Sequence, residues 1–248
     1  MAFQRPKATQ SIYEPEFVQA LFNEMSLTYE RMNTITSFGF SNRWRRQCVF
    51  ELDIKPGQTV VDLMSGMGET WGYICPKIES NGALLGVDFS EGMLHYANQK
   101  RQRKQYASYA ITIHKQNVLA STLPDQCADH VVVAFGLKTF NDDQISQLSK
   151  EIYRILKPGG QFSCVEVSVP KPALLRAFYL FYLRRIIPIL GALFLGNPQT
   201  YRMLGIYCAQ FKNTNQALQL FENAGLICRQ TNYFFGCASG IVGEKPIT

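Results

Sequence analysis

The chain contains 248 residues, of which 46% are hydrophobic, enough to bury the core of one large α/β domain. Its 25 Lys and Arg against 19 Asp and Glu give a net charge of +6, and its seven cysteines include no C-x-x-C pair, so neither a zinc site nor a disulfide framework is expected. The N-terminus lacks the apolar core of a signal peptide, and no stretch reaches the ~18 uninterrupted apolar residues of a membrane span. We therefore predict a single cytoplasmic domain over residues 1–248.

Residues 12–50 are predicted to form a helical cap that precedes the first strand. This cap includes the basic cluster "NRWRRQ" at 42–47, and a second basic cluster, "KRQRK", follows at 100–104. Each cluster is typical of a solvated helix face, with contact to nucleic acid or to an anionic membrane as the alternative. We favour the solvated face and expect no nucleic-acid partner.

Residues 51–171 alternate short β-rich runs with helical patterns and are predicted to form the cofactor-binding core. The predicted strands are 59–64, 83–89, 109–117, 129–136 and 160–168, with helices at 90–104, capped by Ser90, and at 142–156. Near-continuous Val, Ile and Leu runs separated by helices are typical of a parallel sheet covered on both faces. The predicted fold class is α/β, a doubly wound, Rossmann-like, mostly parallel sheet.

The last third of the chain is predicted to contain a helical lid or substrate insert at 172–225 and a terminal hairpin at 226–248. The part of the insert at 172–196 is the nearest approach to a membrane span, but three arginines and a proline interrupt it. It fits three roles: an apolar lid over a lipophilic substrate, a helix lying on a membrane surface, or a helix buried against the sheet.

The stretch "VVDLMSGMGETWG" at 60–72 places Gly66 and Gly68 at the turn between the first strand and the following helix. In an open parallel sheet this turn lies against the ligand, and glycine lets the backbone approach the ligand closely. Asp88 ends the second strand about 20 residues later, where a carboxylate can accept hydrogen bonds from both ribose hydroxyls of a nucleoside. The pattern predicts a nucleoside-containing cofactor, which is NAD, FAD or S-adenosylmethionine.

Two residues discriminate between these cofactors. Trp71 stands where the dinucleotide fingerprint requires a third glycine, so a pyrophosphate is poorly accommodated. Glu69 would repel phosphates at the helix N-terminus but could accept a hydrogen bond from an ammonium group. S-adenosylmethionine is therefore favoured, and Asp62 is placed with Glu69 in its site unless both only cap the helix. The alternatives are a nicotinamide oxidoreductase and a protein that binds S-adenosylmethionine without methylating, such as a cyclase or a sensor.

Seven segments carry a resemblance over about residues 20–246: "LFNEMSLTYERMNTITSFGFSNRWRR", "VVDLMSGMGE", "LLGVDFSEGML", "QNVLASTLPD", "VVVAFGLKTF", "EIYRILKPGGQFSCVEVSVP" and "TYRML". Together they resemble the ubiquinone/menaquinone-biosynthesis C-methyltransferases, a branch of the class I S-adenosylmethionine-dependent methyltransferases. The resemblance implies the following contacts: Gly66, Met67 and Gly68 against the methionine part, Asp88 and Phe89 at the ribose, Asn117 and Val118 beside the adenine, Ala134 and Phe135 near the sulfonium, and Tyr29 on a helix that closes over the cofactor.

The chain also departs from this family. Met67 and Glu69 replace a usual Thr and Asp in the glycine turn, Lys138-Thr139 replaces an Arg-Asn pair, and the usual Pro-Glu-Ser after the "TYRML" segment is absent. The last two changes fall on the substrate side, so the acceptor is expected to be a lipophilic quinol, phenol or other apolar natural product. Transfer to carbon is favoured, transfer to nitrogen or oxygen is the alternative, and a homodimer is left open.

Two side chains are predicted to be catalytic. Carbon methylation of a phenol ring needs the ring as a phenolate and the later removal of a ring proton, for which a base is useful. Lys138, just after the fourth strand, could steady an oxyanion. Glu166, at the carboxyl end of the fifth strand, could orient water or take a proton.

Overall fold

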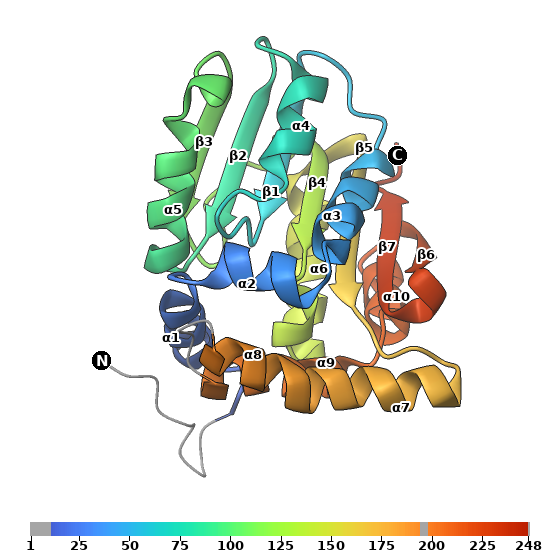
Figure 1. The fold of residues 1–248 in the computed structure, drawn as a ribbon. Coiled ribbons are helices and arrows are strands. Elements are labelled where there is room, and N and C mark those ends of the chain that lie inside the picture. The colour runs from blue at the N-terminus through green and yellow to red at the C-terminus, as the bar shows by residue number, and fades with distance from the viewer. Residues whose placement is uncertain (1–10, 194–197, 248) are drawn as a thin grey trace.

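The computed structural model describes residues 11–193 and 198–247, and its centre is a seven-stranded sheet in the order β3-β2-β1-β4-β5-β7-β6 (Figure 1). The strands are β1 Thr59–Leu63, β2 Ala83–Asp88, β3 Ala110–Lys115, β4 Ala128–Ala134, β5 Leu156–Val167, β6 Ile227–Tyr233 and β7 Ala238–Glu244. Strands β1 to β5 pair in parallel, whereas β7 runs antiparallel to both β5 and β6. The predicted doubly wound, mostly parallel sheet is confirmed, and the C-terminal hairpin extends it at the β5 edge.

Helices cover both faces of the sheet because successive strand residues point to opposite sides and both sides are apolar. Val60 and Val132 pack with α3 (Phe40–Phe50), α4 (Trp71–Ile78) and α5 (Glu91–Arg101), whereas Val61 and Val131 pack with α6 (Asp142–Ile155) and α10 (Asn215–Asn223). The Ser90 hydroxyl accepts a hydrogen bond from the Met93 N–H at 3.2 Å, so the predicted N-cap of α5 is confirmed.

A helical cap lies across the carboxyl ends of the strands (Figure 1). It consists of α1 (Pro15–Met25), α2 (Tyr29–Thr36), α7 (Ala173–Phe181), α8 (Ile187–Leu193) and α9 (Pro198–Phe211). Apolar side chains of α1, α2, α8 and α9 form a third buried cluster that also includes Met67, whereas α7 packs on the second cluster. Asn23 fastens α1 to the sheet, because its side-chain oxygen accepts hydrogen bonds from the Ser90 hydroxyl at 2.7 Å and the Gly92 N–H at 3.0 Å.

Residues 173–193 form one continuous helical stretch, in which a π turn at Tyr182–Ile186 joins α7 to α8. Pro188 lies inside α8, which continues through it. A proline has no N–H to donate, and a wider π turn immediately before it relieves the conflict with the helical bonding pattern. Among the described residues, no helix combines the length and the apolarity that crossing a membrane requires.

The turn between β1 and α4 is built around a close approach of Gly68 to Trp71. Gly68 has a φ of +76°, and a Cβ there would lie 2.5 Å from the Trp71 indole ring. That ring is fully buried, and its Nε1–H donates to Asp62 Oδ2 at 3.1 Å. Glycine at this position therefore allows the indole to lock the helix start against the strand.

We predict that Gly68→Ala lowers the free energy of unfolding by about 1–3 kcal/mol, because the methyl group strains the left-handed backbone and displaces the indole. The matched control is Gly72→Ala inside α4, where the nearest atom to a Cβ is 3.5 Å away. That control should gain about 0.5–1 kcal/mol. Urea unfolding of both variants measures the difference, and equal stabilities would contradict the packing described for Gly68.

Candidate active site

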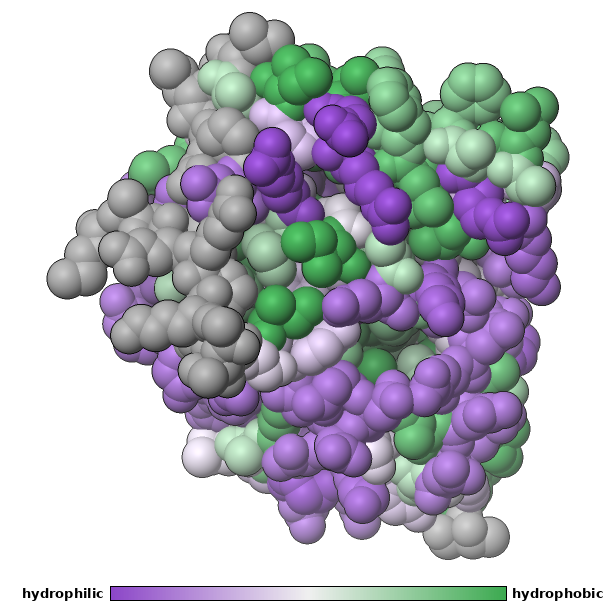
Figure 2. All heavy atoms as spheres, turned by 90° about the horizontal axis from the view of Figure 1, so that it is seen from below, coloured by the Kyte–Doolittle hydropathy of each residue, from purple (hydrophilic) through white to green (hydrophobic). Residues whose placement is uncertain are grey.

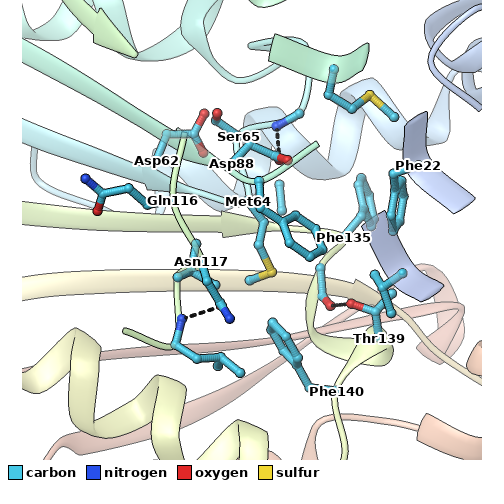
Figure 3. Close-up of a pocket in the computed structure, with 18 of the residues that line it drawn as sticks. Phe22, Asp62, Met64, Ser65, Asp88, Gln116, Asn117, Phe135, Thr139 and Phe140 are labelled. Carbon is cyan, nitrogen blue, oxygen red and sulfur yellow. Dashed lines mark hydrogen bonds between the residues drawn. The ribbon is translucent and has the colours of Figure 1, made fainter. Parts of the chain in front are cut away.

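A pocket opens where β1, β2 and β4 end, beneath α1 and α2 (Figure 3). The sheet order reverses between β1 and β4, which is the position where doubly wound sheets bind their ligands. Most of the residues predicted to contact the cofactor line this pocket: Tyr29, Asp62, Gly66, Asp88, Phe89, Asn117, Val118, Ala134 and Phe135. Met67 and Gly68 lie just behind it, because Met67 packs into the helical cap and Gly68 faces Trp71.

The Asp88 carboxylate joins the first two strand–helix turns. Its Oδ2 accepts from the Gly66 N–H at 2.9 Å, and its Oδ1 accepts from the Ser90 N–H at 2.9 Å. Because each carboxylate oxygen can accept more than one hydrogen bond, both remain able to bind a pair of ribose hydroxyls. Burial raises the pKa of Asp88 to about 6, opposed in part by the two backbone N–H donors.

Ser65 provides an unused hydrogen-bonding group in the same pocket. Its hydroxyl is buried and has no partner in the described structure, although most buried polar groups are hydrogen-bonded. It lies beside Asp88 in Figure 3, at the start of the glycine turn. An unpartnered hydroxyl next to a carboxylate with spare acceptor capacity fits a polar ligand such as the cofactor.

Asp62 lies at the base of the pocket and is almost fully buried. Its Oδ2 accepts from the Thr70 hydroxyl at 2.6 Å and from the Trp71 indole, so it does help to hold the start of α4. Burial raises its pKa to about 7. Asp62 also lines the pocket, so its structural role and its predicted cofactor contact are compatible.

The interpretation of "NRWRRQ" as a solvated face is wrong for Arg45, which is only 3% exposed. Its guanidinium lies 3.2 Å from Glu69 Oε1 and stacks over the Phe135 ring at 4.9 Å. The other Glu69 oxygen accepts from the Met67 N–H at 3.0 Å. Spacing in the sequence could not separate Arg45 from its exposed neighbours, because its charge is neutralised by a residue on a different element.

In the second cluster Lys100 is also buried, and its Nζ donates to the Gly68 carbonyl at 3.2 Å.

Backbone strain marks the ends of the two central strands. Met64 follows β1 with a φ of +55°, and Phe135 follows β4 with a φ of +66°. Left-handed backbone is costly for residues other than glycine and is concentrated at functional sites. Both side chains line the pocket, as Figure 3 shows. Sequence reasoning missed Met64 and Ser65, although both lie within the quoted glycine-turn stretch.

A second, apolar cavity of about 360 Å³ adjoins the first and shares Tyr29 and Phe135 with it. Aromatic and aliphatic side chains from α2, α3, α7 and α9 form most of its wall. Burial raises the pKa of Tyr29 to about 12, so its hydroxyl stays protonated at the junction of the two cavities. We call this second space the apolar cavity.

Lys138 is the one charged side chain among the described residues that line the apolar cavity. Its Nζ donates to Glu166 Oε1 at 2.9 Å and to the Phe135 carbonyl at 2.7 Å. Glu166 is completely buried behind it and also accepts from the Lys138 and Val167 N–H groups. The structure thus brings the two predicted catalytic residues together. Thr139, the other half of the substituted pair, lines the first pocket instead.

This doubly wound sheet, with an acidic residue at the end of β2 and a glycine turn after β1, defines the class I S-adenosylmethionine-dependent methyltransferase fold. Solved structures agree. An S-adenosylmethionine-dependent methyltransferase from Aquifex aeolicus matches with a TM-score of 0.56 at 17% identity, covering 80% of this chain and 88% of that one. Geranyl diphosphate C-methyltransferase from Streptomyces coelicolor matches with a TM-score of 0.57 at 11% identity, covering 82% and 77%.

The sequence comparisons are more specific. The profile of the ubiE/COQ5 methyltransferase family matches residues 9–245. Demethylmenaquinone methyltransferase from Lactiplantibacillus plantarum is 31% identical over 92% of this chain and 95% of its own length, and that from Geobacillus sp. is 31% identical over 93% and 97%. The chain belongs to the ubiE/COQ5 methyltransferase family. It is an enzyme that uses S-adenosylmethionine, so the predicted cofactor is confirmed.

We predict that affinity for S-adenosylhomocysteine falls as the pH decreases through about 6. Ribose hydroxyls donate to the ionised Asp88, so binding requires loss of a proton below that pH, at up to about tenfold per pH unit. Asp88→Asn should weaken binding at every pH by about 1.5–3 kcal/mol for each charge-assisted bond lost. Calorimetry from pH 8 to pH 5 tests both expectations. A wild-type affinity that does not change over this range, or an Asn variant that binds like wild type, would exclude the ribose contact.

Ser65→Ala should separate ligand binding from stability. The hydroxyl has no partner among residues 11–193 and 198–247, so its removal is expected to leave the free energy of unfolding unchanged or slightly raised. Affinity for S-adenosylhomocysteine should fall by about 0.5–1.5 kcal/mol, the usual net value of one hydrogen bond. Thermal unfolding and calorimetry on the same preparation give both values. Unchanged affinity would show that the hydroxyl does not contact the cofactor.

Proposed function

We propose that this enzyme transfers the methyl group of S-adenosylmethionine to a ring carbon of a lipophilic quinol or phenol. The observation that carries the proposal is the position of Lys138, the one charged side chain among the described residues that line the cavity next to the cofactor pocket. An apolar wall with one charged group suits an apolar ring that carries an ionisable oxygen. The relatives named demethylmenaquinone methyltransferase support the same acceptor class.

Lys138 is suited to stabilising the oxygen of the acceptor. An ammonium group carries three protons, and Glu166 and the Phe135 carbonyl take two of them. The third remains for an oxygen in the cavity. S-adenosylmethionine would supply an electrophilic methyl group, and an ionised ring oxygen makes the adjacent ring carbon nucleophilic. As the new carbon–carbon bond forms the methyl–sulfur bond breaks, S-adenosylhomocysteine leaves, and the ring proton is then released to water as the ring regains its aromaticity. A fixed cation in a water-poor cavity would favour this ionised form.

Glu166 acts in this proposal through Lys138 and does not touch the acceptor. It does not line the apolar cavity, and both its oxygens accept hydrogen bonds from protein groups. We therefore assign it a positioning role in place of the direct proton transfer considered from the sequence. The buried pair lets a charge persist in the cavity wall, since an unpaired buried ammonium would be strongly disfavoured.

The acceptor class is tested by incubating the enzyme with methyl-labelled S-adenosylmethionine and a panel of quinols, phenols and amines. Mass spectrometry finds the labelled product, and NMR locates the methyl group. We expect the label on a ring carbon of a reduced quinone. Labelling of an oxygen or nitrogen, or turnover of amines in preference to quinols, would overturn the proposal.

We predict that Lys138→Met lowers kcat by about 10²–10³, the usual loss of one preorganised electrostatic contact, and leaves S-adenosylhomocysteine affinity unchanged. The single variant leaves Glu166 unpaired, so Lys138→Met/Glu166→Leu is needed as a folded comparison. Lys138→Arg keeps the charge and should recover part of the rate. If the double variant is as active as wild type on its best acceptor, Lys138 does not stabilise the acceptor oxygen.

A further inference from the structure

The whole net charge of the protein comes from one segment. Residues 167–221 contain six Lys and Arg and no Asp or Glu, while the rest of the chain balances 19 basic against 19 acidic residues. This segment includes α7, α8 and α9, the outer helices of the cap. Arg184, Arg185 and Arg202 are exposed and line one shallow hollow between the π turn and α9. The charge pattern favours an anionic partner for this face.

The same helical stretch exposes large apolar side chains. Leu174, Phe178, Phe181 and Ile189 are between 56% and 73% exposed. Their spacing places them along one side of the helix, next to the side that closes the apolar cavity, and Phe178 lies at the boundary because it also lines that cavity. Figure 2 views this face, and hydrophobic side chains gather along its upper part with strongly hydrophilic ones between them. Apolar side chains interspersed with arginines are typical of a helix that lies in a membrane interface.

The apolar cavity reaches the surface at this patch. Phe38, Phe178 and Phe234 line the cavity and are also strongly exposed, so they lie at its rim. Phe235 extends the exposed surface beside Phe234. Water-exposed aromatic side chains around a cavity mouth are unfavourable unless something apolar covers them.

We propose that the face formed by α7, the π turn, α8 and α9 docks on an anionic lipid bilayer, with the mouth of the apolar cavity toward the lipid. An anionic bilayer matches both the charged and the apolar parts of this surface. Its headgroups would pair with the arginines, and its interior would bury the phenylalanines. The docking itself is independent of the proposed function. The orientation of the mouth rests on the proposed function, since it gives a lipophilic acceptor a path from the bilayer.

Docking is tested by sedimentation of the full-length protein with vesicles of phosphatidylcholine, with and without phosphatidylglycerol. Wild type should bind the anionic vesicles, and salt should weaken that binding. Arg184→Gln/Arg185→Gln should reduce partitioning about fivefold for each arginine removed. Leu174→Ser/Phe181→Ser should reduce it about tenfold or more. All four positions are exposed, so the variants are expected to fold, which circular dichroism checks.

Matched controls lie at the opposite end of the sheet. Arg103→Gln/Lys104→Gln removes two exposed charges ahead of β3, and Ile227→Ser removes an exposed apolar side chain at the start of β6. These controls should bind vesicles like wild type. Absence of wild-type binding, equal binding to neutral vesicles, or controls as weak as the test variants would each overturn the docking. No acceptor is present in this assay, so its outcome does not depend on the proposed function.

The orientation of the mouth needs a second measurement. Leu174→Ser/Phe181→Ser should retain turnover of a short-chain, water-soluble quinol and lose turnover of a long-chain quinol embedded in anionic vesicles. Neither residue lines the cavity. Equal loss with both acceptors would overturn the orientation. If the wild-type enzyme methylates no quinol, the proposed function is refuted. The vesicle-binding assay would still decide whether the protein docks on the bilayer.

Discussion

The buried Asp88 carboxylate is the constraint on which the cofactor pocket depends. It holds the Gly66 and Ser90 N–H groups at the same time, so the turn after β1 and the turn after β2 have fixed positions relative to each other. Ser90 in turn is held by Asn23 of α1, which places the helical cap over the pocket. Replacement of this one carboxylate would therefore disturb the ligand contacts, the glycine turn and the seat of the cap together. Its elevated pKa is the cost of keeping it in that buried position.

Much of the fold and of the cofactor pocket follows from local sequence patterns. The Val-rich runs identify strands buried on both faces, and Ser90 identifies the start of α5 because a helix N-terminus needs a side-chain acceptor. Gly66 and Asp88 are predictable because a strand-end turn that touches a nucleoside needs glycine and a carboxylate at that spacing. The family resemblance added Asn117, Val118 and Tyr29, which no local rule identifies and which line the pocket.

The rest depends on contacts between residues distant in the sequence. The burial of Arg45 follows from Glu69 on another element, and the pairing of Lys138 with Glu166 requires β4 and β5 to lie side by side. The sequence cannot show that the Ser65 hydroxyl lacks a hydrogen-bond partner among the described residues, because this depends on which side chains surround it in the fold. The three roles left open for 172–196 illustrate the same limit. The helix turns out to be apolar on two sides, one closing the cavity and one exposed, which periodicity alone could not assign.

We propose that the cofactor and the acceptor occupy two adjoining cavities that meet at Tyr29 and Phe135. A crystal structure with S-adenosylhomocysteine tests this most directly. We expect ribose hydroxyls on Asp88 and a sulfur atom directed past Phe135 into the apolar cavity, toward Lys138. A cofactor bound elsewhere, or one whose sulfur faces away from that cavity, would contradict it.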